Sequence, residues 1–204
     1  MVEEQLAARG IVDRRVLDAM ARVPREAFVG QEDQKRAYLD MPLRIGFGQT
    51  ISQPYMVAII CQTADVREGD RVLDIGTGSG YQAAVLSELS GDVHTVERIP
   101  QLAERARERL EAAGYGSVDV HEGDGSLGLP EHAPYNAIVV AAAAPDMPTS
   151  LYEQLVPRGR LVVPVGGPEG QRLEVIVRSP EGPAITRSVP CRFVPLVGAE
   201  GYDE

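Results

Sequence analysis

Short apolar runs alternate with segments of helical periodicity through the centre of the chain. The runs suited to buried strands cover residues 72–75, 94–97, 118–122, 135–141 and 160–165. Segments with helical spacing lie between them, at residues 82–89, 100–114 and 147–155. This alternation predicts an α/β fold with one doubly wound, mostly parallel, Rossmann-like sheet that carries helices on both faces.

The N-terminal part of the chain predicts a helical segment that covers the sheet domain. Its predicted elements are two short helices at residues 2–9 and 13–22 and an irregular stretch at 24–43. We expect Phe28, Tyr38 and Leu39 to anchor this segment onto the main domain.

The C-terminal part is strand-rich, with turns marked by glycine and proline. The expected strands are residues 171–177, 184–189 and 192–197, which would complete the sheet edge in antiparallel fashion. We expect one domain over residues 1–204, made of an N-terminal helical cover (1–50), cofactor-binding βα units (51–165) and C-terminal strands (166–204).

Three alternating glycines end the first run, in the sequence Val72-Leu-Asp-Ile-Gly-Thr-Gly-Ser-Gly80-Tyr81. Glycine lets the backbone approach a ligand closely, because it lacks a Cβ atom and tolerates positive φ. Dinucleotide sites prefer G-x-G-x-x-G and a helix N-terminus that faces a pyrophosphate. Here the spacing is tighter, and Asp74 would repel a phosphate but suits a ligand with an amine and a sulfonium. The pattern therefore resembles the first motif of S-adenosylmethionine-dependent methyltransferases, and this resemblance implies that Asp74, Gly76, Thr77, Gly78 and Gly80 would hold that cofactor. A turn that simply needs glycines is the alternative.

Two further acids follow predicted strands. Glu97 comes 23 residues after Asp74, which is roughly the interval at which a Rossmann-like unit offers a carboxylate to a ribose. Asp124 and Gly125 follow the strand at 118–122, and ligands bind at the carboxyl ends of strands in open α/β sheets. We expect these two residues to meet the adenine; an aspartate in a glycine-rich turn is the alternative.

A polar trio, Gln49, Thr50 and Ser52, precedes a helical pattern at residues 55–64. Ser52 followed by Gln53-Pro54 is typical of a helix N-cap with proline in the first turn. On local chemistry alone, capping is the simpler interpretation of Ser52. Capping and a role in the reaction do not exclude each other.

Composition and charge narrow the range of partners. A formal net charge of −10 and a pI near 4.8 oppose binding to phosphate backbones, so nucleic acid is not expected as a partner.

Cys61 and Cys191 have no metal or redox spacing, and His121 and His132 look isolated, so we expect no metal site. The chain has no leader pattern and no apolar run near about 18 residues, and it begins directly at the first helix. We therefore expect a cytoplasmic protein without membrane contact or N-terminal extension.

The motifs together resemble the protein-L-isoaspartate (D-aspartate) O-methyltransferase family. The matching stretches, in order and separation, are Gly48 to Pro54, Val72 to Tyr81, Glu97, Gly123 to Gly125 and Phe193 to Gly198. The specific part is Thr50-Ile-Ser-x-Pro54, since many methyltransferases share the glycine motif. The resemblance covers nearly the whole chain, including the N-terminal helices.

The resemblance implies an enzyme that methylates the α-carboxylate of L-isoaspartyl residues in damaged peptides and proteins. The methyl ester would close to a succinimide and reopen to normal aspartate, which amounts to protein repair. S-adenosyl-L-methionine would be the cofactor and S-adenosyl-L-homocysteine its product, and we expect a monomer.

By position, the resemblance also implies roles for individual residues. Ser52 matches the active-site serine, and Thr50 and Ile51 would line the cofactor with it. The segment Val194, Pro195, Leu196 and Val197 would lie beside the bound peptide. Some members have a histidine where this chain has Val57, so a histidine contact is not available there.

The expected chemistry needs no His/Asp pair, because a carboxylate is already ionised at neutral pH. Two alternatives remain open. A different S-adenosylmethionine enzyme, acting on a small molecule or RNA, would share the glycine loop, Glu97 and Asp124 but would not need Thr50 to Ser52. A non-catalytic protein that binds damaged protein would use the same residues as the enzyme.

Overall fold

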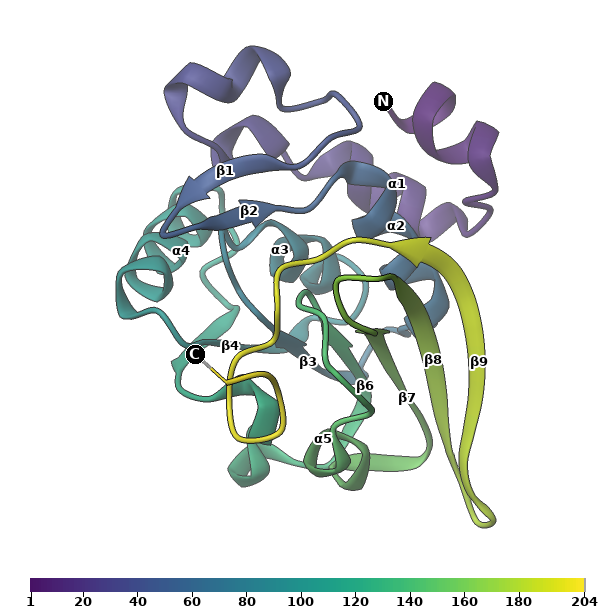
Figure 1. The fold of residues 1–204 in the computed structure, drawn as a ribbon. Coiled ribbons are helices and arrows are strands. Elements are labelled where there is room, and N and C mark those ends of the chain that lie inside the picture. The colour runs from purple at the N-terminus through teal and green to yellow at the C-terminus, as the bar shows by residue number, and fades with distance from the viewer. Residues whose placement is uncertain (204) are drawn as a thin grey trace.

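A seven-stranded sheet forms the centre of the computed structural model, which describes residues 1–203. Its strand order is β5-β4-β3-β6-β7-β8-β9, parallel from β5 to β7 and antiparallel for β8 and β9 (Figure 1). The strands are β3 (Arg71–Ile75), β4 (Asp92–Glu97), β5 (Asp119–Glu122), β6 (Tyr135–Val140), β7 (Leu155–Val165), β8 (Gln171–Ser179) and β9 (Gly182–Cys191). The order reverses between β3 and β6, so the predicted doubly wound sheet is confirmed.

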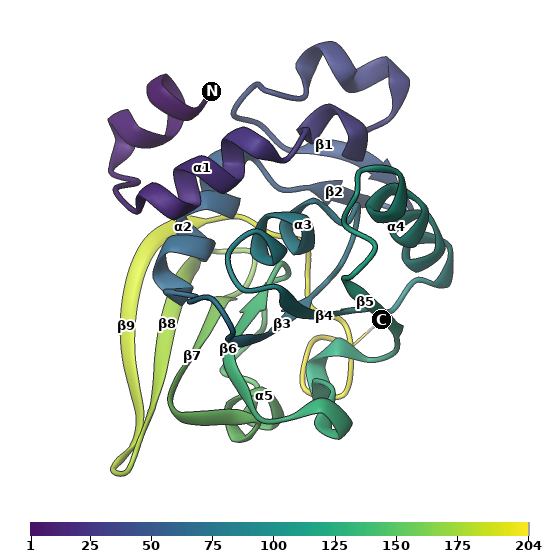
Figure 2. The ribbon, with the colours of Figure 1, turned by 180° about the vertical axis from the view of Figure 1, so that it is seen from behind.

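Helices cover both faces of the sheet (Figures 1 and 2). They are α1 (Arg14–Arg22), α2 (Pro54–Ala64), α3 (Tyr81–Ser87), α4 (Pro100–Ala112) and α5 (Thr149–Glu153). One core cluster joins Val72 of β3 to side chains of α1 to α4, and a second joins Leu73 to Leu151 of α5. Consecutive residues of β3 thus point into different cores, which is why this strand is apolar without interruption.

The N-terminal segment consists of short helical turns above the carboxyl ends of the central strands (Figure 1). Besides α1 they are a π-helix (Val2–Leu6) and 3-10 helices at Ala7–Arg9, Arg25–Phe28 and Gln31–Arg36. The prediction for Phe28 is confirmed, because its ring is fully buried and meets Tyr81 edge-on at a centroid distance of 5.7 Å. The predictions for Tyr38 and Leu39 are wrong: they are 41% and 49% exposed, and polar contacts such as Gln5 Nε2 to the Tyr38 carbonyl hold their turn instead.

A small antiparallel hairpin that the sequence pattern did not predict lies next to this segment. It pairs β1 (Leu43–Gly46) with β2 (Gln49–Ile51), and Phe47 stands at its tip with φ of 52°. Glycines 46 and 48 allow the tight reversal, since both have positive φ. The hairpin places the residues that follow it, including Ser52, near the end of the sheet.

Residues 192–197 were expected to form a strand, and this prediction is wrong. The segment is extended but pairs only through single bridges, Ala143 with Pro195 and Val197 with Tyr202. Pro195 has no N–H to donate, so a regular ladder cannot continue through it. The chain therefore leaves β9 and crosses in front of the carboxyl ends of the central strands (Figure 1).

Within residues 1–203, no helix is both long and apolar enough to cross a bilayer.

Candidate active site

A cavity of about 890 Å³, partly open to solvent, lies at the carboxyl ends of β3, β4 and β6. Six segments far apart in the sequence meet there: β2 with Ser52, the loop after β3 with the start of α3, the end of β4, the loop after β5, the loop after β6 and the C-terminal segment. Of the residues singled out from sequence, it is lined by Thr50, Ile51, Ser52, Gly76, Thr77, Gly78, Glu97, Gly125, Val194, Pro195, Leu196 and Val197. We call it the main cavity.

The glycine loop after β3 is held against the neighbouring strand. The N–H groups of Gly76 and Thr77 donate to the Val96 carbonyl at 2.9 and 3.3 Å. Gly78 has φ of 54°, and a Cβ atom there would lie 3.2 Å from Ile45 Cδ1 of the hairpin. A larger residue at this position would therefore strain the backbone and crowd the hairpin.

Glu97, at the end of β4, is buried in the wall of the main cavity. Its Oε2 accepts from the Gly78 N–H at 2.8 Å and its Oε1 accepts from the Ile99 N–H at 3.0 Å. Each carboxylate oxygen has two acceptor sites, so both oxygens retain capacity for a ligand hydroxyl. The side chain thus fixes the glycine loop and can still bind a diol.

Asp74 lies beneath the cavity and is not among its lining residues. It accepts from Gln82 Nε2 at 2.7 Å and from Thr95 Oγ1 at 3.0 Å, and Thr95 Oγ1 is 2.7 Å from Thr77 Oγ1. Burial raises the pKa of Asp74 to about 7, although these hydrogen bonds favour the charged form. Its carboxyl group therefore connects to the cavity through Gln82 and through the threonine pair.

Gln82, in the first turn of α3, was not singled out from the sequence. Its side chain lines the main cavity and is buried, and its Oε1 has no hydrogen-bond partner among the described residues. A buried acceptor without a donor is costly unless a ligand or water satisfies it. A polar residue directly after the glycine loop is the signal that could have identified it.

Gly80 and Asp124 also lie outside the cavity lining. Gly80 precedes α3 with φ of 90°, and a Cβ atom there would meet Leu110 at 3.1 Å. Asp124 accepts at Oδ1 from the N–H and the hydroxyl of Ser126 (2.9 and 2.7 Å) and at Oδ2 from the Ala199 N–H (2.7 Å). Burial opposes its charge, but these hydrogen bonds dominate and lower the pKa of Asp124. This aspartate fastens the C-terminal segment to the loop that carries Gly125.

Ser52 does not cap α2, contrary to the simpler interpretation of the sequence. The N-cap residue is Gln53, and the carboxylate of Asp40 accepts from the Tyr55 N–H at 2.9 Å. The half-buried Ser52 hydroxyl makes no hydrogen bond to any residue within 1–203. The cap is supplied from another loop, so this hydroxyl is available for a ligand.

The backbone of Ser52 is held by Arg25, a fully buried residue of the N-terminal segment. Arg25 donates from Nη2 to the Ser52 carbonyl at 2.6 Å and from Nε to the Ala37 carbonyl at 2.7 Å. Its guanidinium also lies 4.7 Å from the centroid of the Tyr81 ring. The N-terminal segment thereby positions the serine loop, a link that no local sequence pattern shows.

A smaller cavity adjoins the main one. Its lining includes Arg192 and Phe193, and it shares with the main cavity Thr50, Ser52, Ala141 and Val194. Among its described lining residues, Arg192 is the charged one, and its side chain is exposed. Ser52 therefore stands where two compartments meet.

The model of the protein-L-isoaspartate (D-aspartate) O-methyltransferase family matches residues 1–201. This chain belongs to that family. As a member of this methyltransferase family it is an enzyme, as predicted.

Individual members of the family agree over nearly the whole chain. A protein-L-isoaspartate O-methyltransferase of Anaeromyxobacter sp. (strain Fw109-5) is 54% identical over 198 residues, which cover 96% of this chain and 81% of that protein. A solved protein-L-isoaspartate O-methyltransferase superposes with a TM-score of 0.88 at 29% identity, over 98% of this chain and 67% of its own. A Plasmodium falciparum protein described as a beta-aspartate methyltransferase, in complex with S-adenosyl-L-homocysteine, gives a TM-score of 0.84 at 25% identity and 96% coverage of both chains. These structures confirm the predicted methyltransferase fold.

Val57 stands where some members of the resembled family have a histidine, so no histidine contact was expected there. Its side chain is 1% exposed and belongs to the core cluster beneath α2. A side chain at position 57 therefore faces the core of the protein.

Proposed function

We propose that this protein transfers a methyl group from S-adenosylmethionine to the free α-carboxylate of L-isoaspartyl residues in damaged proteins. The ester formed can close to a succinimide, which reopens in part to normal aspartate. The observation that carries the assignment of roles is the position of Ser52, whose unpartnered hydroxyl lies where the main and the smaller cavity meet. The main cavity would hold the cofactor and the smaller one the acceptor.

The main cavity offers donors and acceptors that suit S-adenosylmethionine. Glu97 would accept from the ribose hydroxyls, and the free Gln82 Oε1 would accept from the ammonium group. Asp74, buried below, would balance the cationic charge through Gln82 and the threonine pair. Thr50, Ile51, Gly76, Gly78 and Gly125 would pack against the ligand, whereas Asp124 and Gly80 would support the surrounding loops.

The acceptor side needs orientation and desolvation more than proton transfer. When bound, the cofactor supplies a methyl group whose bond to sulfur breaks as the carboxylate oxygen bonds to its carbon, with the electron pair left on sulfur. No proton moves, because the carboxylate is already ionised. Ser52 would donate its hydroxyl hydrogen to one carboxylate oxygen and so aim the other, and positioning of this kind supplies several kcal/mol. Arg192 would attract the anion to the smaller cavity.

The peptide would lie along residues 194–197 of the C-terminal segment. This segment is anchored by the Ala143 N–H, which donates to the Val194 carbonyl at 2.8 Å, and by the Leu196 N–H, which donates to the Ala143 carbonyl at 2.8 Å. Its outward side is then free for substrate, and Pro195 is exposed there. We infer that the protein acts as a monomer, and the charge of −10 argues against nucleic acid as a partner.

Labelled cofactor offered with matched aspartyl and isoaspartyl peptides tests the proposal. We expect label only in the isoaspartyl peptide, as a base-labile ester. Label in neither peptide, with cofactor binding intact, would leave a binder of damaged protein or a methyltransferase for another substrate. Equal labelling of both peptides would contradict the specificity for isoaspartyl residues.

A further inference from the structure

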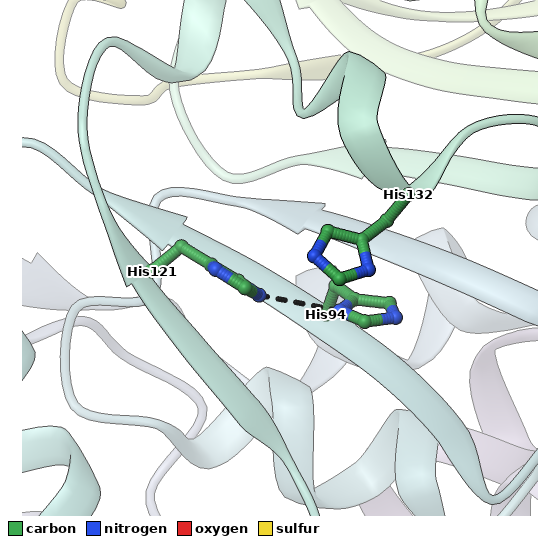
Figure 3. A group of neighbouring side chains, drawn as sticks. All are labelled: His94, His121 and His132. Carbon is green, nitrogen blue, oxygen red and sulfur yellow. Dashed lines mark hydrogen bonds between the residues drawn. The ribbon is translucent and has the colours of Figure 1, made fainter.

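The three histidines of the chain, its full complement, come together on one face of the sheet. His94 lies in β4, His121 in β5 and His132 in a 3-10 turn (Pro130–His132), and ring centroids are 4.3 to 5.4 Å apart. Figure 3 shows the His132 ring over the His94 ring, with His121 directed toward them from the neighbouring strand. The interpretation of His121 and His132 as isolated is therefore wrong. We call this group the histidine cluster.

The parallel register of β4 and β5 explains how residues 27 positions apart meet. His94 is opposite Asp119 and Val96 is opposite His121, so both histidines project from the same face, two residues out of step. His94 is buried, whereas His121 and His132 are half-buried and accessible. The cluster is separate from the active site, since none of the three histidines is among the described lining residues of the main cavity. Along β4, His94 also precedes Glu97 by three residues, which corresponds to roughly 10 Å.

We propose that the histidine cluster is a binding site for a divalent first-row transition-metal ion, with Zn²⁺ as the representative. One ring nitrogen from each histidine can be chosen such that all three lie within 4.8 Å of one another. His94 Nδ1 and His121 Nε2 are 3.2 Å apart. Two ligands about 2.0–2.1 Å from a tetrahedral Zn²⁺ are about 3.3 Å apart, so this pair already has the required spacing.

Two carboxylates complete the arrangement around His94. Asp119 Oδ2 lies 3.8 Å from His94 Nδ1, on the side where the metal would bind, and can serve as a fourth ligand. Asp92 Oδ1 lies 3.4 Å from the other nitrogen, Nε2, and is itself held by Arg71 Nε at 3.0 Å. A carboxylate on the outer nitrogen keeps the proton there and directs the lone pair of Nδ1 inward, as is usual for metal-bound histidine.

The donor set determines the class of metal. Three imidazoles with one exposed carboxylate suit Zn²⁺, Ni²⁺, Co²⁺ or Cu²⁺, whereas Mg²⁺ and Ca²⁺ prefer sites made of oxygen. His132 stacks on His94 with an interplanar angle of 34°, so it must rotate to present a nitrogen. Its element is a single 3-10 turn, which can make this adjustment, and bound metal would then tie that turn to strands β4 and β5.

Stacked neutral imidazoles that merely fill the sheet edge are the alternative. Burial and the neighbouring His132 lower the pKa of both His94 and His121, which keeps lone pairs available at neutral pH in either case. The alternative therefore differs from the proposal in metal affinity.

Calorimetric titration of chelator-treated protein with ZnCl₂ distinguishes the two. We expect one Zn²⁺ per chain, and at least tenfold weaker binding for His121→Gln and for His132→Gln. Glu122→Gln is the matched control, since it neighbours His121 on the opposite face of β5 and pairs with Arg107, and its affinity should equal that of the unaltered protein. Thermal melting identifies any variant that fails to fold.

A second measurement needs no variant. All histidine ring signals in a proton NMR spectrum come from the cluster, because the chain has three histidines in total. We expect all three to shift together on addition of one equivalent of Zn²⁺. Unmoved histidine signals, or zinc affinity that is the same in the folded His121→Gln and His132→Gln variants, would overturn the proposal.

Discussion

Replacing Asp74 by asparagine should make the ligand-free protein more stable at pH 8 and leave it nearly unchanged at pH 4. The side chain is fully buried and keeps its shape in this substitution. Asparagine can accept from Gln82 through Oδ1 and donate to Thr95 through Nδ2, after which the Thr95 hydroxyl turns to donate to Thr77. Every hydrogen bond therefore has a partner in the variant.

The magnitude follows from the titration of Asp74. Burial raises its pKa from the ordinary 3.8 to about 7. Between these values the folded protein holds a proton that the unfolded chain has released, so the free energy of unfolding falls as the pH rises and levels off above about 7. The slope is at most about 1.4 kcal/mol per pH unit, and the whole interval amounts to several kcal/mol. Asparagine has no such dependence.

Urea unfolding of both proteins at pH 4, 6 and 8 measures the effect. The difference in the free energy of unfolding, variant minus unaltered protein, should grow with pH in favour of the variant and become constant above about 7. Other titrating groups cancel in this difference. A difference that is independent of pH, or that grows in the opposite direction, would refute the argument that Asp74 is a buried carboxyl without a cation in the free enzyme.

Cofactor binding should stabilise the unaltered protein more than the Asp74→Asn variant. A cationic ligand above Asp74 favours the ionised form, which asparagine does not have. We expect saturating S-adenosylmethionine to raise the melting temperature of the variant less than that of the unaltered protein. Equal shifts would mean that Asp74 does not interact with the bound charge.

Two further substitutions test the roles of neighbouring residues. Glu97→Ala should weaken S-adenosylmethionine binding about tenfold or more by calorimetry, because ribose acceptors worth about 1.4 kcal/mol or more are lost. Glu97→Gln should lose less affinity for the cofactor. Unchanged affinity in both variants would contradict the assignment of Glu97 to the ribose. Arg25→Met should lower kcat with little change in cofactor Kd, because the Ser52 backbone loses its hydrogen bond, and Arg36→Met, at an exposed ion pair, should change neither. A loss of cofactor affinity in Arg25→Met equal to its loss of kcat would show that Arg25 acts on the whole cavity and not on Ser52.

The parts of the fold that depend on local pattern could be predicted from the sequence. Val72 and Leu73 face opposite cores, and an uninterrupted apolar run is the direct record of burial on both faces. The glycine loop could also be predicted from the sequence, because Gly76 and Gly78 adopt positive φ angles that few other residues accept. The expected placement of a ligand at these strand ends followed from the sheet topology.

The parts that depend on distant hydrogen bonds could not be predicted. The local sequence predicts that Ser52 caps α2. In the structure the Asp40 carboxylate, fifteen residues from Tyr55, accepts from the Tyr55 N–H instead. The hydrogen bond that Asp124 accepts from the Ala199 N–H, 75 residues away, could likewise not be predicted from the sequence. In both cases the hydrogen-bond partner lies in a distant part of the chain, so the spacing of residues in the sequence could not identify it.

The histidine cluster could not be predicted either, because it depends on how two strands pair in the sheet. His94 and His121 meet because of strand register, and a shift by one residue would turn one of them to the other face. The sequence suggested that His121 and His132 were isolated, since the two do not lie at metal-finger spacing.

The kinetics of Ser52→Ala test the central claim most directly. Since Asp40 caps α2, the free energy of unfolding should change by less than about 0.5 kcal/mol, and cofactor Kd should hardly change. Loss of a hydrogen bond to a charged oxygen, about 1.5–3 kcal/mol, predicts that kcat/KM for an isoaspartyl peptide falls roughly 10- to 100-fold. Ser87→Ala, whose hydroxyl bonds to the Ala84 carbonyl in α3, is the control and should keep full activity. Full turnover in a folded Ser52→Ala variant would contradict the claim that this serine orients the carboxylate.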